Sequence, residues 1–291
     1  MELRQLQYFA VLAEELHFKR AADRLFIVQP ALSRQIQVLE QDLGVVLFDR
    51  DKRHVALTEA GKFLQQKSRQ MLAAAQEIRN QIPLVAGGEQ GEVRIGYVGS
   101  CIHTIFPKLL PQLHEQYPLI QAYLSEMVTS NQLAALRSGQ LDIGFLRNPP
   151  LDERFEQKVV FEEPYALVLR EDYPLNQSDF YSLKQVAQEP FIMPTRSDGE
   201  NYYRYMMGFC EEAGFSPKVA HETVHGQTIL KLIELGLGIS ILPVSFEGVS
   251  SGKLKFFPLP NTDRQAQLTA YWPKEAANPV LKNFLKLFYA G

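Results

Sequence analysis

The spacing of apolar residues between positions 18 and 44 predicts two short helices joined by a tight turn. In the second helix the apolar positions lie three or four residues apart, at Leu32, Ile36, Leu39 and Leu43. Such a stripe predicts one buried helical face. Gly44 comes next, and glycine commonly ends helices. The first helix is indicated by apolar and small residues at similar spacing, namely Phe18, Ala21, Ala22 and Leu25.

The opposite face of the second predicted helix is polar. It carries Gln29, Pro30, Ser33, Arg34 and Gln37. Gln, Ser and Arg side chains can reach base edges in the DNA major groove, and proline is tolerated in the first turn of a helix. The pattern therefore favours a helix-turn-helix whose second helix enters the groove. An ordinary pair of helices packed in a protein core fits the same spacing.

A β-hairpin is predicted directly after these helices. Residues 45–48 are apolar, residues 49–54 read DRDKRH, and apolar positions alternate over residues 55–57. The charged turn carries Arg50, Lys52 and Arg53 at or near its tip. Cations there can meet DNA phosphates or enter a narrow minor groove. A solvated charged turn is the alternative interpretation.

Residues 1–61 contain, in order, QYFAVLAEE, AADRLF, QPALSRQIQVLEQDLGVVLFDR and LTEAG. On these motifs the chain resembles the LysR-type transcriptional regulators. The resemblance implies a winged helix-turn-helix over residues 1–58, with the helix-turn-helix at 18–37, and a sequence-specific DNA-binding regulator controlled by a small effector. By matching positions it assigns the DNA contacts to Gln29, Pro30, Ser33, Arg34 and, in the wing, Arg53. The chain departs from the family at Val28, where a capping serine is usual, because valine has no side-chain oxygen.

Residues 59–88 predict a linker helix followed by a hinge. Thr58 can cap the helix, and Pro83 is expected to stop it. The seam averages 3.5 residues and consists of Leu64, Ser68, Met71, Ala75, Ile78 and Ile82. Packing against its own chain is one interpretation, whereas the resemblance implies a dimerising helix. Dimerisation would let two recognition helices read a pseudo-palindrome. The resemblance further implies a homotetramer built as a dimer of dimers, with RNA polymerase as a partner if the protein is an activator.

From residue 92 onward strands and helices alternate, which predicts parallel α/β structure. In the first unit the predicted strands are 93–98, 120–126 and 141–146, and the helices are 104–117 and 131–138. In the second unit the strands are 165–170, 190–193, 218–224 and 238–243, and the helices are 182–188, 201–213 and 227–235. A final strand at 268–272 and a helix at 278–289 return to the first unit.

This layout resembles a two-lobed periplasmic-binding-protein fold, so the predicted fold class is α/β throughout the carboxyl-terminal part. The effector-binding domain is expected at 89–291. Lobe I covers about 92–163 and 266–291, and lobe II covers about 164–265, with crossovers near Glu163 and Gln265. In such folds the ligand lies between the lobes, at strand carboxyl ends and helix amino termini.

The strand-end rule selects candidate ligand contacts. They are Gly99-Ser100, Thr129-Ser130, Arg147, the loop 197–203 and His225-Gly226. By resemblance to family members that sense aromatic acids, the effector contacts map to Ser100, Thr129, Arg147, Tyr202 and His225. Hydroxyls, open helix N–H groups and an arginine predict a small anionic organic effector, for example a carboxylate. Each hydroxyl taken alone can instead be a helix cap.

One motif points to a different class of protein. Residues 221–225 read HETVH, a literal H-E-x-x-H, which on a helix places two imidazoles around zinc. However, Thr223 and Val224 are β-branched, which favours a strand. Residues four apart in a strand stand about 13 Å from each other, too far to share one ion. A zinc metalloprotease that uses His221, Glu222 and His225 is therefore a weak alternative. A ligand sensor that does not bind DNA is another.

Composition adds limited information. The 291 residues carry a formal net charge of -3 and 46% hydrophobic residues, which suits two or three globular domains. Residues 1–87 hold 12 Lys or Arg against 10 Asp or Glu, a balance of +2, and the remainder holds 18 against 23, a balance of -5. The small basic excess lies in the part predicted to bind DNA.

Several classes of protein are not expected. The chain shows no signal-peptide pattern and no apolar run near the roughly 20 residues of a membrane span, which favours the cytoplasm and no membrane partner. Cys101 and Cys210 lack metal-type spacing and are expected to be buried, with a thiol sensor as the alternative. No nucleophile elbow, phosphate loop or dinucleotide motif occurs, so no enzyme activity, catalytic residue, metal or cofactor is predicted.

Overall fold

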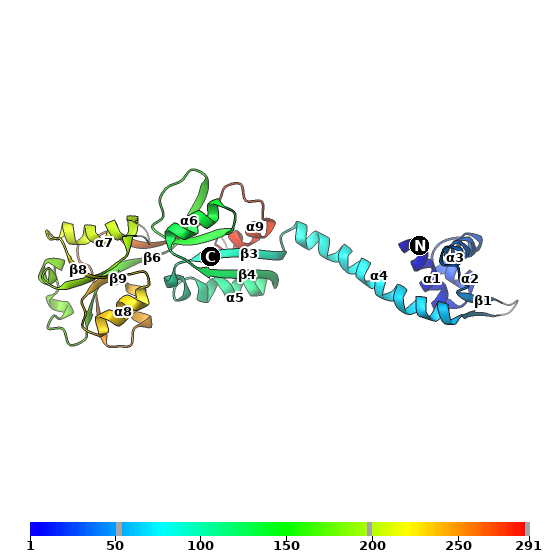
Figure 1. Cartoon of the computed structure of the whole chain (residues 1–291), viewed down its shortest axis with the longest axis horizontal. Coiled ribbons are helices and arrows are strands. Elements are labelled where there is room, and N and C mark those ends of the chain that lie inside the picture. Colours follow the sequence, from blue (N-terminus) through cyan, green and yellow to red (C-terminus); the bar gives the residue numbers. More distant parts are fainter. Residues whose placement is uncertain (51–53, 197–199, 289–291) are drawn as a thin grey trace. The chain divides into compact units, whose positions relative to one another are not determined.

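The computed structural model describes residues 1–50, 54–196 and 200–288 (Figure 1). Lys52 and Arg53 at the predicted wing tip therefore fall outside the described residues. The same holds for residues 197–199 of the predicted ligand loop at 197–203. The chain forms two compact units, Met1–Leu84 and Val85–Gly291. Among the helices in the described part of the chain, none is long and apolar enough to cross a membrane.

The amino-terminal unit is a three-helix cluster with a hairpin. Its elements are α1 (Leu3–Glu15), α2 (Phe18–Arg24), α3 (Gln29–Leu43), β1 (Phe48–Arg50) and β2 (Val55–Leu57). The predicted stripe on α3 is buried at Leu32, Ile36 and Leu39. The prediction is wrong for Leu43, which is 37% exposed because the last turn of α3 extends beyond the apolar cluster. The helix α1 was not predicted, although Leu6, Phe9 and Leu12 form much of this core.

The turn between α2 and α3 brings the two helices close together. Ala21 and Ala22 are buried in the cluster, as their small size predicts. Val28 occupies the N-cap position of α3 in an extended conformation and, as expected, makes no side-chain cap with the described residues. Gly44 ends the helix in a left-handed conformation with a φ of 68°. The local start and stop of α3 thus follow directly from its sequence.

A short antiparallel hairpin connects this cluster to α4 (Glu59–Ala86). The Oγ1 of Thr58 accepts a hydrogen bond from the N–H of Gly61 at 3.0 Å, so the predicted cap is confirmed. Gly61 itself packs closely, because a Cβ there would lie 2.2 Å from the carbonyl oxygen of Leu47. The expected stop at Pro83 is wrong, since α4 continues to Ala86. Proline removes the hydrogen bond of its own N–H, yet the helix continues for three residues beyond it.

The first lobe of the second unit is built on a mixed sheet. It contains β3 (Gln90–Tyr97), β4 (Leu119–Glu126), β5 (Ile143–Arg147), and parts of β6 (Phe155–Arg170) and β11 (Gln265–Pro273). The strands β4, β3 and β5 are parallel, as predicted, whereas β11 runs antiparallel to β5 and β6. The helices are α5 (Phe106–Gln116), α6 (Thr129–Arg137) and α9 (Pro279–Lys286). Figure 1 shows them around this sheet.

The second lobe contains β7 (Pro190–Pro194), β8 (Lys218–Thr223), β9 (Ser240–Pro243), β10 (Leu254–Pro258), α7 (Glu200–Glu212) and α8 (Gly226–Glu234). The pair β7 and β8 is parallel, whereas β9 and β10 are antiparallel to β6. Two predictions fail here. The segment 182–188 forms a short 3-10 turn over Leu183–Val186, and β10 was missed because its apolar run is short and flanked by lysines.

The strand β6 belongs to both lobes (Figure 1). It pairs with β11 as far as Pro164, opposite Gln265, and then with β9 and β10. In lobe II alternate residues of β6 face two different apolar clusters. Tyr165 and Leu167 belong to the cluster that includes α7, whereas Ala166 and Val168 belong to the cluster that includes α8. Burial of both faces explains why this segment is continuously apolar.

Candidate DNA-reading surface and interlobe cavity

The polar side chains predicted on α3 lie on its solvent-facing side. Gln29, Pro30, Arg34 and Gln37 are exposed, and Ser33 is partly exposed. The buried stripe on the other side of α3 fixes this orientation. The helix can therefore present amide, hydroxyl and guanidinium groups outward together, which is the chemistry that base edges require.

The wing cation Arg50 has neighbours within its own unit. Its Nη2 lies 2.6 Å from Oε2 of Glu40 on α3, and its guanidinium lies 5.2 Å from the centre of the Phe18 ring. Arg50 therefore ties the hairpin to the helices, in addition to any role near DNA. The predicted wing contact, Arg53, lies outside the described residues.

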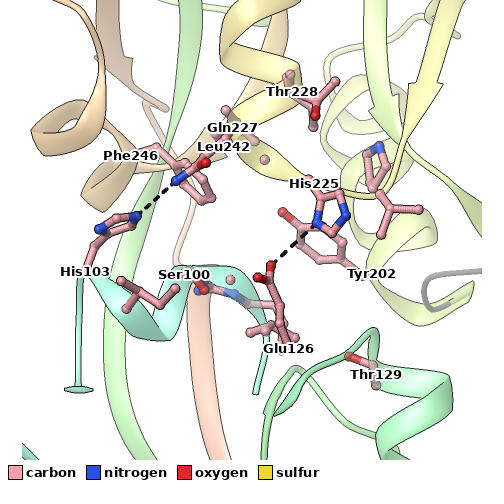
Figure 2. Close-up of a pocket in the computed structure, with 18 residues that line it drawn as sticks. Ser100, His103, Glu126, Thr129, Tyr202, His225, Gln227, Thr228, Leu242 and Phe246 are labelled. Carbon is pink, nitrogen blue, oxygen red and sulfur yellow. Dashed lines mark hydrogen bonds and ion pairs between the residues drawn. The ribbon is translucent and has the colours of Figure 1, made fainter. Parts of the chain in front are cut away.

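A cavity of about 400 Å³ lies between the two lobes of the second unit (Figure 2). It is lined by all five predicted effector contacts, which are Ser100, Thr129, Arg147, Tyr202 and His225. They come from separate elements: the turn after β3, the start of α6, the end of β5, α7 and the N-cap of α8. The strand-end rule thus brings together residues that are up to 125 positions apart in the sequence, as the numbering of Ser100 and His225 shows.

Two helices begin at this cavity, α6 beside Thr129 and α8 beside Gly226. Within the described structure, their N-cap residues Val128 and His225 make no side-chain cap. Uncapped first turns keep backbone N–H groups available and carry partial positive charge. These ends favour an anion in the cavity.

Arg147 is the most deeply buried polar residue of the cavity wall, with 6% of its surface exposed. Its Nη2 donates to Oγ of Ser100 at 2.8 Å. Its Nη1 lies 3.6 Å from Oε1 of Glu163 and makes no hydrogen bond with any described residue. Glu163 is also buried and accepts hydrogen bonds from the N–H and the Oγ of Ser245. A buried guanidinium N–H without a hydrogen bond is costly, so a ligand oxygen at Nη1 would relieve that cost.

Two side-chain bridges cross the cavity between the lobes. Nδ1 of His225 lies 3.5 Å from Oε1 of Glu126, and Nε2 of Gln227 lies 3.4 Å from Nε2 of His103. Figure 2 shows both. Glu126, His103 and Gln227 are not among the effector contacts predicted from the sequence. Glu126 is the last residue of β4, so the strand-end rule could have found it, whereas the other two carry no such signal.

Apart from Thr228, the remaining wall of the cavity is apolar. It includes Ile102, Pro194, Val224, Ile229, Leu242 and Phe246. Phe246 comes close to the start of α8, because a Cβ on Gly226 would lie 2.4 Å from its ring. The glycine therefore allows an aromatic ring to pack directly against the helix amino terminus. The cavity combines a polar end with an apolar wall, as small-molecule sites commonly do.

The structure also bears on the zinc motif. His221 lies in β8, so this part of the segment is a strand, as its β-branched residues predict, and lacks the helix that the motif needs. Searched over the described residues, the structure contains no group of three or more His, Cys, Asp or Glu side chains arranged to hold a metal ion.

The two cysteines lie in separate apolar clusters, Cys101 in lobe I and Cys210 in lobe II. Both are fully buried, as expected. Burial raises the pKa of each thiol to about 12. Because the thiolate is the reactive form, the burial and raised pKa of both thiols disfavour a redox-sensor role.

Comparison with known proteins gives a consistent result across the chain. Residues 3–62 match the family described as bacterial regulatory helix-turn-helix protein, lysR family, and residues 86–290 match the LysR substrate binding domain. The uncharacterized HTH-type transcriptional regulator YnfL of Escherichia coli (strain K12) is 37% identical over 287 residues, which are 98% of this chain and 96% of that protein. The HTH-type transcriptional regulator AlsR of Bacillus subtilis (strain 168) is 35% identical, over 99% of this chain and 95% of that protein.

Solved structures extend the comparison to the fold. The crystal structure of CbnR, a LysR family transcriptional regulator, superposes with a TM-score of 0.85 at 27% identity, covering 99% of this chain and all of that chain. Full-length CbnR complexed with its target DNA superposes with a TM-score of 0.84 at 27% identity, covering 99% of each chain. The predicted architecture, a helix-turn-helix domain followed by a two-lobed α/β domain, is therefore confirmed.

Proposed function

Because the chain belongs to the LysR family of DNA-binding transcriptional regulators, we propose how its two parts divide that function. The DNA-binding domain is residues 1–58, the linker 59–88 and the effector-binding domain 89–291. DNA bases are read from the outer face of α3 by Gln29, Pro30, Ser33 and Arg34, with Arg53 in the wing. The observation that supports this is the exposure of those α3 side chains opposite the buried Leu32, Ile36 and Leu39. The protein regulates rather than catalyses, and acts in the cytoplasm, where its operator DNA would be.

The effector site is the interlobe cavity. A small organic anion would place one carboxylate near Nη1 of Arg147, which makes no hydrogen bond with any described residue, and near the uncapped amino termini of α6 and α8. Ser100, Thr129, Tyr202 and His225 would lie around it. Because the cavity walls come from both lobes, a bound effector would change how the lobes are disposed. That change would alter the spacing of the DNA-reading heads in the oligomer.

The first part of the predicted seam packs on its own chain, because Ser68 is buried and Leu64 contacts the amino-terminal apolar cluster. Oligomerisation through α4 is supported by the exposed second part of the seam. Met71 is 46% exposed, Ile78 is 57% exposed and Ile82 is 61% exposed, at the spacing of a coiled coil. A second copy of the chain would bury these side chains, and we propose a dimer of dimers. Ile78→Glu should shift sedimentation toward smaller species, while Gln76→Glu, on another face of α4, should not. Unchanged sedimentation of Ile78→Glu would refute the role of this seam.

DNA reading is tested by selecting bound fragments from random DNA and then measuring affinity for the selected operator. Arg34→Ala should weaken operator binding by about tenfold or more, the size of one lost base contact. Arg79→Ala, which removes an exposed cation from α4, is the matched control. If Arg34→Ala leaves operator affinity and its salt dependence unchanged, a sensor that does not read DNA through α3 becomes the better interpretation.

The effector site is tested by calorimetry over a panel of small organic acids. Ligands that bind the wild-type protein should bind Arg147→Gln at least tenfold more weakly, because the buried guanidinium is lost. Undiminished binding of every ligand to this variant would show that the effector lies elsewhere.

A further inference from the structure

The interlobe cavity has few positive charges with which to bind an anion. Arg147 lies 3.6 Å from the buried Glu163, so this pair together contributes little net charge. Glu126 adds a second carboxylate, and its ion-pair partner His225 is charged only when protonated. Of the described residues that line the cavity, Arg147 and Glu126 carry full charges, with His103 and His225 as titratable neighbours. The cavity therefore offers a ligand one arginine, and it already contains the carboxylate of Glu126.

Glu126 lies beside the expected position of the ligand carboxylate. A Cβ on Gly99 would be 2.7 Å from Oε1 of Glu126, so this oxygen rests against the backbone directly before Ser100. Ser100 in turn accepts the hydrogen bond from Arg147. One oxyanion can lie at Nη1 of Arg147, and a second carboxylate beside it would face the carboxylate of Glu126.

The apolar wall sets the nature of the rest of the ligand. Ile102, Val224 and Leu242 line the cavity, together with Ile229 and Phe246. A charged group placed against these side chains would lose its hydration without gaining a partner. Hydrocarbon or aromatic carbon is stabilised there instead. A volume of about 400 Å³ limits the body of the ligand to a compact size.

We propose that the effector is a monocarboxylate with a compact apolar body, and that Glu126 is the residue that excludes dicarboxylates. This inference rests on the proposed effector site between the lobes. Arg147, Ser100 and the two helix amino termini bind the carboxylate, while the apolar wall binds the body. Glu126 repels any second carboxylate, and its bridge to His225 holds its side chain at the cavity.

The test compares ligands that differ by one carboxylate. The probes are straight-chain carboxylates of two to eight carbons and benzoate, with adipate and terephthalate as the dicarboxylate partners of hexanoate and benzoate. Calorimetry on the full chain should show that hexanoate or benzoate binds, with an affinity about tenfold or more above that of the matching dicarboxylate. Tenfold is the size expected for two like charges about 6 Å apart in a partly hydrated site.

Glu126→Gln keeps the shape of the side chain and removes its charge. In this variant the preference for the monocarboxylate should fall to about threefold or less, because dicarboxylates gain affinity. Glu115→Gln, which removes an exposed carboxylate from α5, should keep the wild-type preference.

Three outcomes would overturn the inference: no monocarboxylate binds, both members of each pair bind equally to the wild-type protein, or Glu126→Gln keeps the full preference. The proposed site is judged separately. If monocarboxylates bind and Arg147→Gln does not weaken them, the site between the lobes is wrong, whatever the selectivity.

Discussion

Val28 at the start of α3 offers a direct test of how the recognition helix is held. Its side chain is 69% exposed and provides no oxygen to the first turn. We predict that Val28→Ser stabilises the start of α3, because a serine Oγ can accept a backbone N–H. Val28→Ala is the matched control, since it removes the same exposed methyl groups without adding an acceptor.

The structure sets the size of this effect. Caps are worth about 0.5 to 2 kcal/mol, depending on how many N–H groups they satisfy. Here Pro30 has no N–H, and the N–H of Ala31 already donates to the carbonyl oxygen of Val28 at 3.0 Å. That carbonyl also accepts from the N–H of Leu32 at 3.3 Å. A serine Oγ would therefore give the N–H of Ala31 a second acceptor. It would not satisfy several N–H groups that lack one. The expected gain is about 0.5 to 1 kcal/mol, the lower part of the range.

Hydrogen exchange followed by mass spectrometry on the full chain measures this locally. A gain of about 0.5 to 1 kcal/mol corresponds to roughly two- to fivefold slower exchange in peptides covering the start of α3. Peptides from α9 should be unchanged. Equal protection of Val28→Ser and Val28→Ala would refute the capping argument. A gain above tenfold would show that Pro30 and the existing bond limit the cap less than proposed.

Three further predictions concern stability and reactivity. Burial raises the pKa of Asp142, but hydrogen bonds from the side chain and backbone of Arg94 outweigh it and hold the pKa below its ordinary value. The resulting stability is present above the unfolded-state pKa near 4 and is lost as pH falls through the folded value. Asp142→Asn should therefore flatten the acid side of the unfolding curve followed by circular dichroism, and an unchanged curve would contradict this linkage. Because both thiols are buried with raised pKa values, Cys101 and Cys210 should react with a thiol reagent at pH 8 only after unfolding in guanidinium. For the same reason, treatment with peroxide should leave operator binding intact. Gly61→Ala should destabilise the amino-terminal unit by about 3 kcal/mol through overpacking, seen as faster proteolysis of that unit in the full chain, and normal resistance would show that the backbone can move aside.

Local sequence patterns were sufficient where a structural element depends on its own residues. The stripe of α3, its end at Gly44, the cap at Thr58 and the strand nature of the segment around His221 all follow from spacing and residue type. The failures occurred where tertiary packing decided the outcome. Leu43 has the spacing of a buried residue but lies beyond the apolar cluster, and α4 continues past Pro83 to Ala86.

The candidate effector site shows the same division. The strand-end rule found Ser100, Thr129 and Arg147 because the topology of a parallel sheet determines where its strands end. It could not show that Arg147 faces Glu163, since the two lie on different strands and meet through a buried contact. Nor could it pair Glu126 with His225, which belong to different lobes.

The sequence by itself determined the kind of protein, through its motifs' resemblance to the LysR-type regulators together with spacing: a helix whose outer face can read DNA, an apolar seam on a long helix, and a two-lobed α/β domain with ligand-binding groups at its strand ends. Periodicity and residue chemistry are local properties, so one chain is enough to recognise them. The tertiary structure alone decided the electrostatics of the cavity, because charges interact through distance and burial rather than through sequence separation. It places the Arg147 guanidinium beside one buried carboxylate and Glu126 at the same cavity, which is why selectivity, unlike family, could not be predicted from the sequence.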